Sequence, residues 1–411
     1  MIRPTHVQRS LVQPAASVGW LAMVTIGWTG LLIPSLIRSI KETFGQTDAG
    51  IGLVFLLYSL AYAAASFVGG ALTERLGRRT VLTGAAILHG AGIVSLGLAP
   101  GWVLFVILTL PAGFGAGSLD GGSNGLFLDL FRAGRGRAMN LLHVFFSVGA
   151  LSAPLVIGTL IDAGVAWQLV MVGSGMVPLL LGAALWMIPM PSGRAAEPPP
   201  ADAGPDAHPG KATPADAGSR RRRLSTPLVL LGIAIAAYVA SEVGVSNWLV
   251  RFLEPAPLST ATFALSLFWA GLGVGRLVSS AIADRFDHVR FTVACAGILA
   301  VALVGAVAVP VLPVSIALFT IAGAAMGPIF PMIVALGGER YPERSAAVSG
   351  LLIGCAVVGG TVYPPLMGVL SVTVGLTVAM FGTALMGAVS AVGLLAFDRR
   401  TLRLTGNGGR A

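Results

Sequence analysis

Three fully charged residues stand inside long apolar runs of the chain, away from the ends of those runs: Asp120, Glu242 and Arg276. At the centre of a membrane helix such a charge costs about 2.5 to 3.5 kcal/mol on insertion scales, so each residue is a candidate for function. A carboxyl group there can exchange a proton and accept hydrogen bonds from a polar solute. Asp120 and Glu242 are therefore candidates for proton coupling and solute binding, whereas a structural ion pair with an acid is an equal alternative for Arg276.

Other polar side chains accompany the two acids. Asn124 lies four residues after Asp120, so a helix places both on one face. Acids, amides and aromatic rings suit a polyhydroxylated solute, because they offer acceptors for hydroxyl groups and flat apolar surfaces for C–H faces. The alternative for Trp248, near the end of its run, is an interfacial anchor. The predicted solute-binding residues are Asp120, Asn124, Asn140, His143, Glu242, Asn247 and Trp248.

The composition places these residues in a membrane. Of 411 residues, 55% are hydrophobic and 10% are charged, whereas a typical soluble domain carries ~25% charged residues. Twelve apolar runs of bilayer-spanning length begin near residues 17, 50, 80, 102, 138, 166, 226, 260, 290, 314, 345 and 374. Backbone groups in lipid must be bonded internally, so we expect an all-α membrane protein with twelve transmembrane helices.

The positions of the basic residues predict the topology. Of the Lys and Arg residues, 22 lie in the N-terminus, alternate loops and C-terminal tail, against Arg38, Lys41 and Arg251 on the other side. This bias predicts that both termini are cytoplasmic, in a cell inner (plasma) membrane. Because the charge lies in short loops, the net charge of +9 does not indicate a nucleic-acid partner.

A repeat with a constant offset of 210 residues relates the two halves of the chain. Parallel repeats of six helices, with a solute site between them near the midplane, are a transporter arrangement. The matched pairs are Glu74 with Asp284, Arg75 with Arg285, Gly113 with Gly323, Gly117 with Gly327, Gly149 with Gly359, Pro154 with Pro364 and Gly158 with Gly368.

The repeat and the composition predict the organisation of the chain. We expect a cytoplasmic N-terminus over 1–16, six-helix halves over 17–190 and 225–397, and a cytoplasmic tail over 398–411. Between the halves, 191–224 is rich in Pro, Ala and charge, and it should be a disordered cytoplasmic linker.

A charged motif follows the second apolar run, with a partial copy in the second half. The acid and the arginines can form a network that locks one conformation and breaks in another. The alternative is a tight turn whose arginines only set topology. The predicted gating residues are Gly70, Glu74, Arg75, Arg78, Arg79, Asp284 and Arg285.

This motif resembles the signature loop of the major facilitator superfamily, with Glu74 where Asp is usual. Asp120 and Asn124 match the acid-x-x-x-Asn pattern of the fucose, galactose and glucose proton symporter family. The stretch from Asn140 to Gly149 is similar to that family's Asn-Leu-x-Gln-x-Phe-x-Ser-x-Gly. The resemblance implies two pseudo-symmetric six-helix bundles, and proton-linked symport of a monosaccharide or similar polar solute by alternating access, in either direction. We expect the protein to act as a monomer.

The chain departs from that family at two positions. Family members can carry a coupling acid four residues before a helix-one proline, but Gly30 precedes Pro34 here, and His143 replaces a common Gln. Coupling therefore rests on Asp120 or Glu242, or is absent, as in a facilitator.

Two rival functions follow from other features. The pattern that ends in Ala153 and Pro154 is loosely similar to an exporter motif, which allows an efflux carrier for an amphipathic compound. A membrane enzyme or sensor is disfavoured, because the sequence contains no metal-ligand cluster, nucleophile constellation or phosphate-binding loop. We expect no cofactor.

Overall fold

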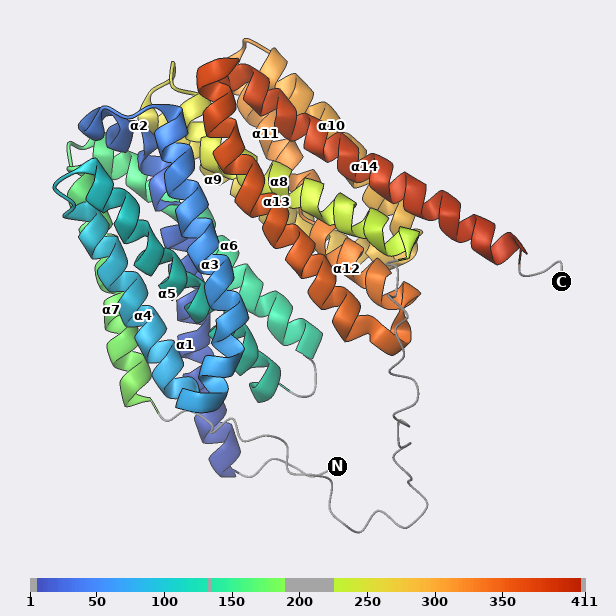
Figure 1. The fold of residues 1–411 in the computed structure, drawn as a ribbon, viewed down its shortest axis with the longest axis horizontal. Coiled ribbons are helices and arrows are strands. Elements are labelled where there is room, and N and C mark those ends of the chain that lie inside the picture. The colour runs from blue at the N-terminus through green and yellow to red at the C-terminus, as the bar shows by residue number, and fades with distance from the viewer. Residues whose placement is uncertain (1–5, 132–134, 189–224, 408–411) are drawn as a thin grey trace, which may run out of the picture.

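The computed structural model describes residues 6–131, 135–188 and 225–407, and the regular secondary structure of this part of the chain is all helical (Figure 1). The helices of the N-terminal half are α1 (His6–Gly30), α2 (Leu32–Phe44), α3 (Asp48–Leu76), α4 (Arg78–Gly97), α5 (Trp102–Leu130), α6 (Arg135–Asp162) and α7 (Trp167–Met187). Those of the C-terminal half are α8 (Thr226–Phe252), α9 (Leu258–Ile282), α10 (His288–Ala308), α11 (Leu312–Met326), α12 (Ile329–Arg340), α13 (Ser345–Thr373) and α14 (Leu376–Asn407). Two short 3-10 turns, Ala283–Arg285 and Pro342–Arg344, follow α9 and α12.

The described residues contain twelve helical segments long and apolar enough to cross a membrane, which confirms the predicted number. Two of these segments consist of two helices each. The first, Pro14–Phe44, is interrupted at Leu31, and the tenth, Leu312–Arg340, is interrupted at Gly327 and Pro328. A proline follows each interruption by three or four residues, at Pro34 and Pro331. Proline lacks the N–H that would bond the preceding turn, which explains both breaks.

The first and last helices extend beyond the apolar segments Pro14–Phe44 and Leu376–Arg399. Helix α1 begins at His6 and α14 continues to Asn407, so helical structure enters the ranges 1–16 and 398–411 that we expect to be cytoplasmic. Apolar length marks where lipid begins, whereas a helix continues as long as each added residue gains a hydrogen bond. The predicted linker, 191–224, lies outside the described residues.

Glycines that are 210 residues apart in the two halves make equivalent contacts between helices. In the N-terminal half, a Cβ atom at Gly113 would lie 2.4 Å from the carbonyl oxygen of Tyr58, so α5 packs closely on α3. In the C-terminal half, a Cβ atom at Gly323 would lie 2.2 Å from the carbonyl oxygen of Phe268, which brings α11 against α9. Phe268 is itself 210 residues after Tyr58, so the repeat in the sequence is a repeat of packing.

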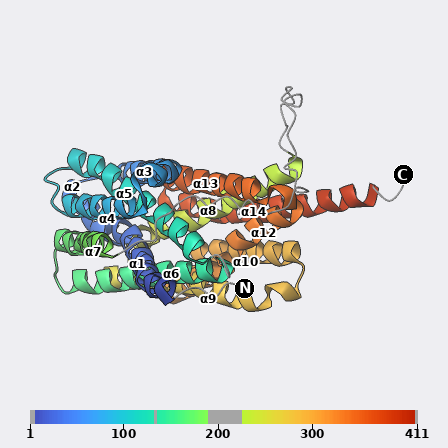
Figure 2. The ribbon, with the colours of Figure 1, turned by 90° about the horizontal axis from the view of Figure 1, so that it is seen from below.

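The halves meet along two further related contacts, α6 against α9 and α3 against α13 (Figure 2). A Cβ atom at Gly158 on α6 would lie 1.9 Å from Oγ1 of Thr262 on α9. A Cβ atom at Gly368 on α13 would lie 3.1 Å from the Cα atom of Gly52 on α3. Both pairs obey the offset of 210 residues, so the interface is pseudo-symmetric.

The helices define two ends of the molecule. We call the end at which α2 leads into α3 the far end, and the end at which α1 begins the terminal end (Figure 1). Contacts that cross the interface near the far end include Trp248 with Phe55, whose ring centroids lie 5.7 Å apart.

Candidate functional site

The carboxylate of Asp120, on α5, is bound by two side-chain donors. The hydroxyl group of Tyr62, on α3, donates to Oδ2 at 2.5 Å, and Nδ2 of Asn124 donates to Oδ1 at 3.0 Å. The close approach of α5 to α3 makes the first contact possible, since a Cβ atom at Gly117 would lie 2.3 Å from the carbonyl oxygen of Tyr62. The structure therefore joins Asp120 and Asn124 as predicted, and it adds Tyr62, which we did not predict.

Asn124 keeps an unused acceptor in this cluster. Its Nδ2 also donates to the carbonyl oxygen of Asp120 at 3.0 Å, whereas its Oδ1 is buried without a partner among the described residues. An unsatisfied buried acceptor costs about 1–3 kcal/mol. This oxygen is thus available to a donor that enters the site.

The second acid also accepts from a tyrosine. On α8, the hydroxyl group of Tyr238 donates to Oε2 of Glu242, one helical turn away. Tyr238 is fully buried, whereas Glu242 is half-buried. Each half therefore contributes one acid whose carboxylate is oriented by a tyrosine.

Electrostatic interactions connect His143 and Arg276 with the two acid clusters. Arg276, on α9, interacts electrostatically with Tyr238, and it also interacts across the interface with His143 on α6. His143 in turn interacts electrostatically with Asp120. Polar groups from both halves, none of them at a helix end, thus interact with one another.

The alternative of a structural ion pair for Arg276 is not seen among the described residues. No ion pair of 4.0 Å or less joins Arg276 to Asp120 or Glu242 within that part of the chain. The guanidinium group is half-buried and retains the capacity to bind an anion.

Trp248 has a different environment from the one that its sequence position indicates. Its side chain is fully buried, and its Nε1 donates to the carbonyl oxygen of Pro364 at 2.8 Å. The interpretation of Trp248 as an interfacial anchor is therefore wrong, because an anchor must reach the lipid headgroups. Its neighbour Asn247 is half-buried. Asn140 lies on α6, and its side chain is outside the described part of the structure.

The predicted gating residues at the terminal end make contacts within the N-terminal half. Arg78 forms an ion pair with Asp129 at the end of α5, and the guanidinium group of Arg79 lies 5.0 Å from the ring centroid of Trp186. Glu74, Arg75 and Arg285 are exposed. Gly70 lies on α3, and the side chain of Asp284 falls outside the described residues.

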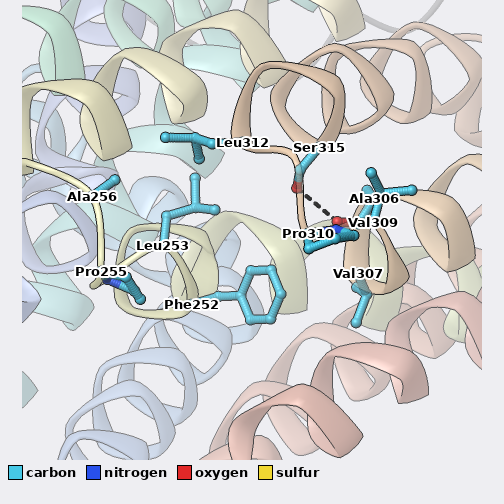
Figure 3. Close-up of a pocket in the computed structure, with 10 residues that line it drawn as sticks. All are labelled: Phe252, Leu253, Pro255, Ala256, Ala306, Val307, Val309, Pro310, Leu312 and Ser315. Carbon is cyan, nitrogen blue, oxygen red and sulfur yellow. Dashed lines mark hydrogen bonds between the residues drawn. The ribbon is translucent and has the colours of Figure 1, made fainter.

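A separate hollow at the far end lies in the C-terminal half alone (Figure 3). It is formed by the end of α8, the connection to α9 and the connection between α10 and α11. Its polar side chain, Ser315, already donates to the carbonyl oxygen of Ala306 at 2.6 Å. Such an apolar surface offers little to a polar solute. Its lining is Phe252, Leu253, Pro255, Ala256, Ala306, Val307, Val309, Pro310, Leu312 and Ser315.

His89 and the metal-binding residue types show no sign of a second site. His89 is fully buried, with Nδ1 2.8 Å from the carbonyl oxygen of Ala112 and Nε2 2.9 Å from Oγ1 of Thr29. Both ring nitrogens of His89 therefore have hydrogen-bond partners within the helix bundle. Over the described ranges, no three His, Cys, Asp or Glu residues converge to hold a metal ion.

Tyr62 was missed because its partner lies 58 residues away on another helix. A lone tyrosine in an apolar run has no local feature that distinguishes a ligand from a packing residue. The one signal is indirect, since Gly113 and Gly117 mark the face of α5 that contacts a neighbouring helix.

Comparison with known proteins supports the same architecture. The chain is 24% identical over 95% of its length to a gentisate transporter of Corynebacterium glutamicum, covering 89% of that protein. It is 24% identical over 93% of its length to a glucose/mannose transporter of Bacillus subtilis, covering 94% of that protein. These relatives are transporters rather than enzymes.

The fold also matches a solved structure over nearly its whole length. A bacterial homolog of the human lysosomal transporter Spinster, in an inward-facing and unoccupied conformation, superposes with a TM-score of 0.77. The match covers 98% of this chain and 99% of that one, at 16% identity. The family model of the Major Facilitator Superfamily matches residues 18–256 and 230–410. The chain is a multi-pass membrane protein that belongs to the Major Facilitator Superfamily.

Proposed function

We propose that this protein is a secondary transporter that moves a small polar solute by alternating access with proton symport. A monosaccharide is the first candidate solute. The observation that supports this proposal is the pair of tyrosine-bound carboxylates, Asp120 in one half and Glu242 in the other. Arg276 and His143 interact electrostatically with these clusters and with each other. A solute bound there contacts both halves, so its binding can bias their relative orientation.

The solute-binding residues that we propose are the polar groups of this region. Carboxylate and amide oxygens accept hydrogen bonds from sugar hydroxyl groups, and Asn124 has an acceptor that no described residue occupies. The glucose/mannose transporter of Bacillus subtilis is a relative over nearly the whole chain. Trp248 and Asn247 lie nearer the far end of α8, and they would contact a solute only when the halves rearrange.

A hydroxylated aromatic carboxylate is the second candidate solute. Arg276 favours it, because its guanidinium group forms no ion pair of 4.0 Å or less with Asp120 or Glu242 in the described part of the chain, and such a group can bind a carboxylate in bidentate fashion. The gentisate transporter of Corynebacterium glutamicum is a relative of similar extent. Export of an amphipathic compound has less support, since the groups that surround Asp120 are polar.

Proton coupling is assigned to Asp120 first and to Glu242 second. Position 30 is glycine and has no group that can take up a proton. Asp120 interacts electrostatically with His143, and its carboxylate accepts from Tyr62 and Asn124, so its protonation changes several contacts at once. Protonation can therefore be linked to solute binding, whereas a facilitator would need no such link.

The remaining parts of the proposal concern topology and gating. The terminal end is cytoplasmic by the distribution of basic residues, and 191–224 tethers the two halves. Glu74, Arg75 and Arg285 are exposed here, and we propose that they engage when the terminal end closes. The protein acts as a monomer, with one solute path between its halves.

Uptake into proteoliposomes tests the function. Purified protein is reconstituted, and uptake of labelled glucose, mannose, galactose, fucose and gentisate is measured with and without an imposed pH gradient. A sugar that accumulates only with the gradient supports sugar–proton symport. If gentisate alone accumulates, the transported solute is an aromatic carboxylate and not a sugar. If uptake is the same with and without the pH gradient, the protein is a facilitator.

A further inference from the structure

The far end contains a buried carboxylate that the solute site does not use. Asp48 is the first residue of α3, and its side chain is 4% exposed. Its Oδ1 accepts from Nζ of Lys41 and from Nε of Arg251, the latter at 3.0 Å. Its Oδ2 accepts from Oγ of Ser371 at 2.5 Å. Arg251 is on α8 and Ser371 is on α13, so one carboxylate joins the two halves.

The two cations that bind Asp48 are related by the internal repeat. Lys41 and Arg251 are 210 residues apart, and each stands near the far end of the first segment of its half. The position that corresponds to Asp48 is Leu258, which cannot accept a hydrogen bond through its side chain. Two equivalent cations therefore converge on a single acid, and the network depends on that acid.

Arg38 adds a second connection beside the first. Its Nε and Nη2 donate to the carbonyl oxygen of Val250 at 3.0 and 2.7 Å, and its Nη1 donates to the carbonyl oxygen of Ala256 at 2.8 Å. Val250 is in the last turn of α8, where carbonyl groups lack intrahelical partners and favour a cation. Arg38 thus caps a helix of the opposite half.

The terminal end has no equivalent among the described residues. The ion pair of Arg78 with Asp129 stays in the N-terminal half, and that of His288 with Glu339 stays in the C-terminal half. All side-chain hydrogen bonds given above that cross between the halves lie at the far end. Among the described residues, these side-chain hydrogen bonds therefore join the halves at the far end.

We propose that Asp48 is a latch that holds the far end closed, and that opening of this end requires its contacts with Arg251 and Ser371 to break. Lys41 stays with Asp48 when the halves separate, because both belong to the N-terminal half, so the carboxylate is not left without a counter-charge. Arg251 likewise keeps Glu254, with which it forms an ion pair in its own half. The network is thus built to exchange an inter-half contact for contacts within each half.

This proposal rests on the alternating access proposed above but not on any solute or coupling ion, so it is tested without transport. Spin labels are attached at Glu42→Cys on α2 and Thr373→Cys at the end of α13, both exposed positions, after Cys295 and Cys355 are replaced by alanine. Distance distributions across the far end are measured by pulsed electron paramagnetic resonance in lipid nanodiscs.

Asp48→Asn keeps the size of the side chain and removes its charge. We expect it to increase the ratio of open to closed far ends about tenfold or more, because hydrogen bonds to a charged group contribute at least that factor. Ser371→Ala should act in the same direction with a smaller shift. Because it preserves the buried charge, it also tests the latch if Asp48→Asn does not fold.

Glu254→Gln is the matched control, since it removes an acid from Arg251 without touching the inter-half contact. We expect it not to increase the population of open far ends, because Glu254 pairs with Arg251 within the C-terminal half. The latch is disproved if folded Asp48→Asn, or Ser371→Ala in its place, gives the distribution of the parent. It is also disproved if Glu254→Gln opens the far end as much as Asp48→Asn does. Loss of any negative charge near Arg251 would then open the far end, whether or not the inter-half contact is kept.

Discussion

Tyr62 on α3 donates a hydrogen bond of 2.5 Å to Asp120 on α5, and so links a transmembrane acid to a helix that also contacts the opposite half through α13. Because of this contact, only α3 separates a change at Asp120, such as protonation or solute binding, from the interface between the halves.

Asp120→Asn should uncouple transport. The amide keeps the size of the side chain and one acceptor but cannot ionise, so counterflow exchange of solute should persist while accumulation driven by a pH gradient disappears. Both are measured in proteoliposomes. Glu242→Gln is the matched control for the second half, and loss of accumulation in that variant alone would move the proton site to α8.

Tyr62→Phe should weaken solute transport while the protein still folds. The hydroxyl group orients the carboxylate, and a hydrogen bond to a charged group is worth about 1.5–3 kcal/mol, so we expect kcat/KM to fall about tenfold or more. Tyr58→Phe, one turn earlier on α3, is the control, and it should retain the parent value. Equal kinetics in the two variants would show that the Tyr62 contact has no role in transport.

Gly158→Ala should destabilise the interface between α6 and α9. Its Cβ atom would lie 1.9 Å from Oγ1 of Thr262, and such overpacking costs typically about 1–3 kcal/mol. We expect a lower Tm in detergent, with partial recovery when Thr262→Gly is added, because the second change removes the clash. Gly173→Ala is the control, since nothing lies within 4 Å of the added carbon atom.

Glu74→Gln should change access to the terminal end if the charged motif engages when that end closes. Single cysteines replacing the exposed residues Leu128 on α5 and Arg340 on α12 would be labelled from the terminal side. We expect faster labelling in the variant, because the closed state loses a contact. Unchanged labelling would leave the arginines of the motif with a topological role only.

Much of the architecture was predictable because it depends on local or periodic properties. Apolar length alone determines that a segment crosses lipid, and Pro34 and Pro331 explain the two helix breaks. The offset of 210 residues predicted the equivalence of the halves, and the contacts of Gly158 and Gly368 share that offset. Asp120 and Asn124 were predicted together because one helical turn separates them.

The partners of these groups were decided only by the tertiary structure. Tyr62 reaches Asp120, and Asp48 reaches Arg251 and Ser371, through contacts between helices that are far apart in the chain. Trp248 is buried against the opposite half, although its position near a helix end allowed a lipid-facing anchor. Hydropathy and periodicity specify which residues enter the membrane and which share a helical face, but the rotation and register of one helix against another depend on packing between helices. That packing determines which acid receives which donor.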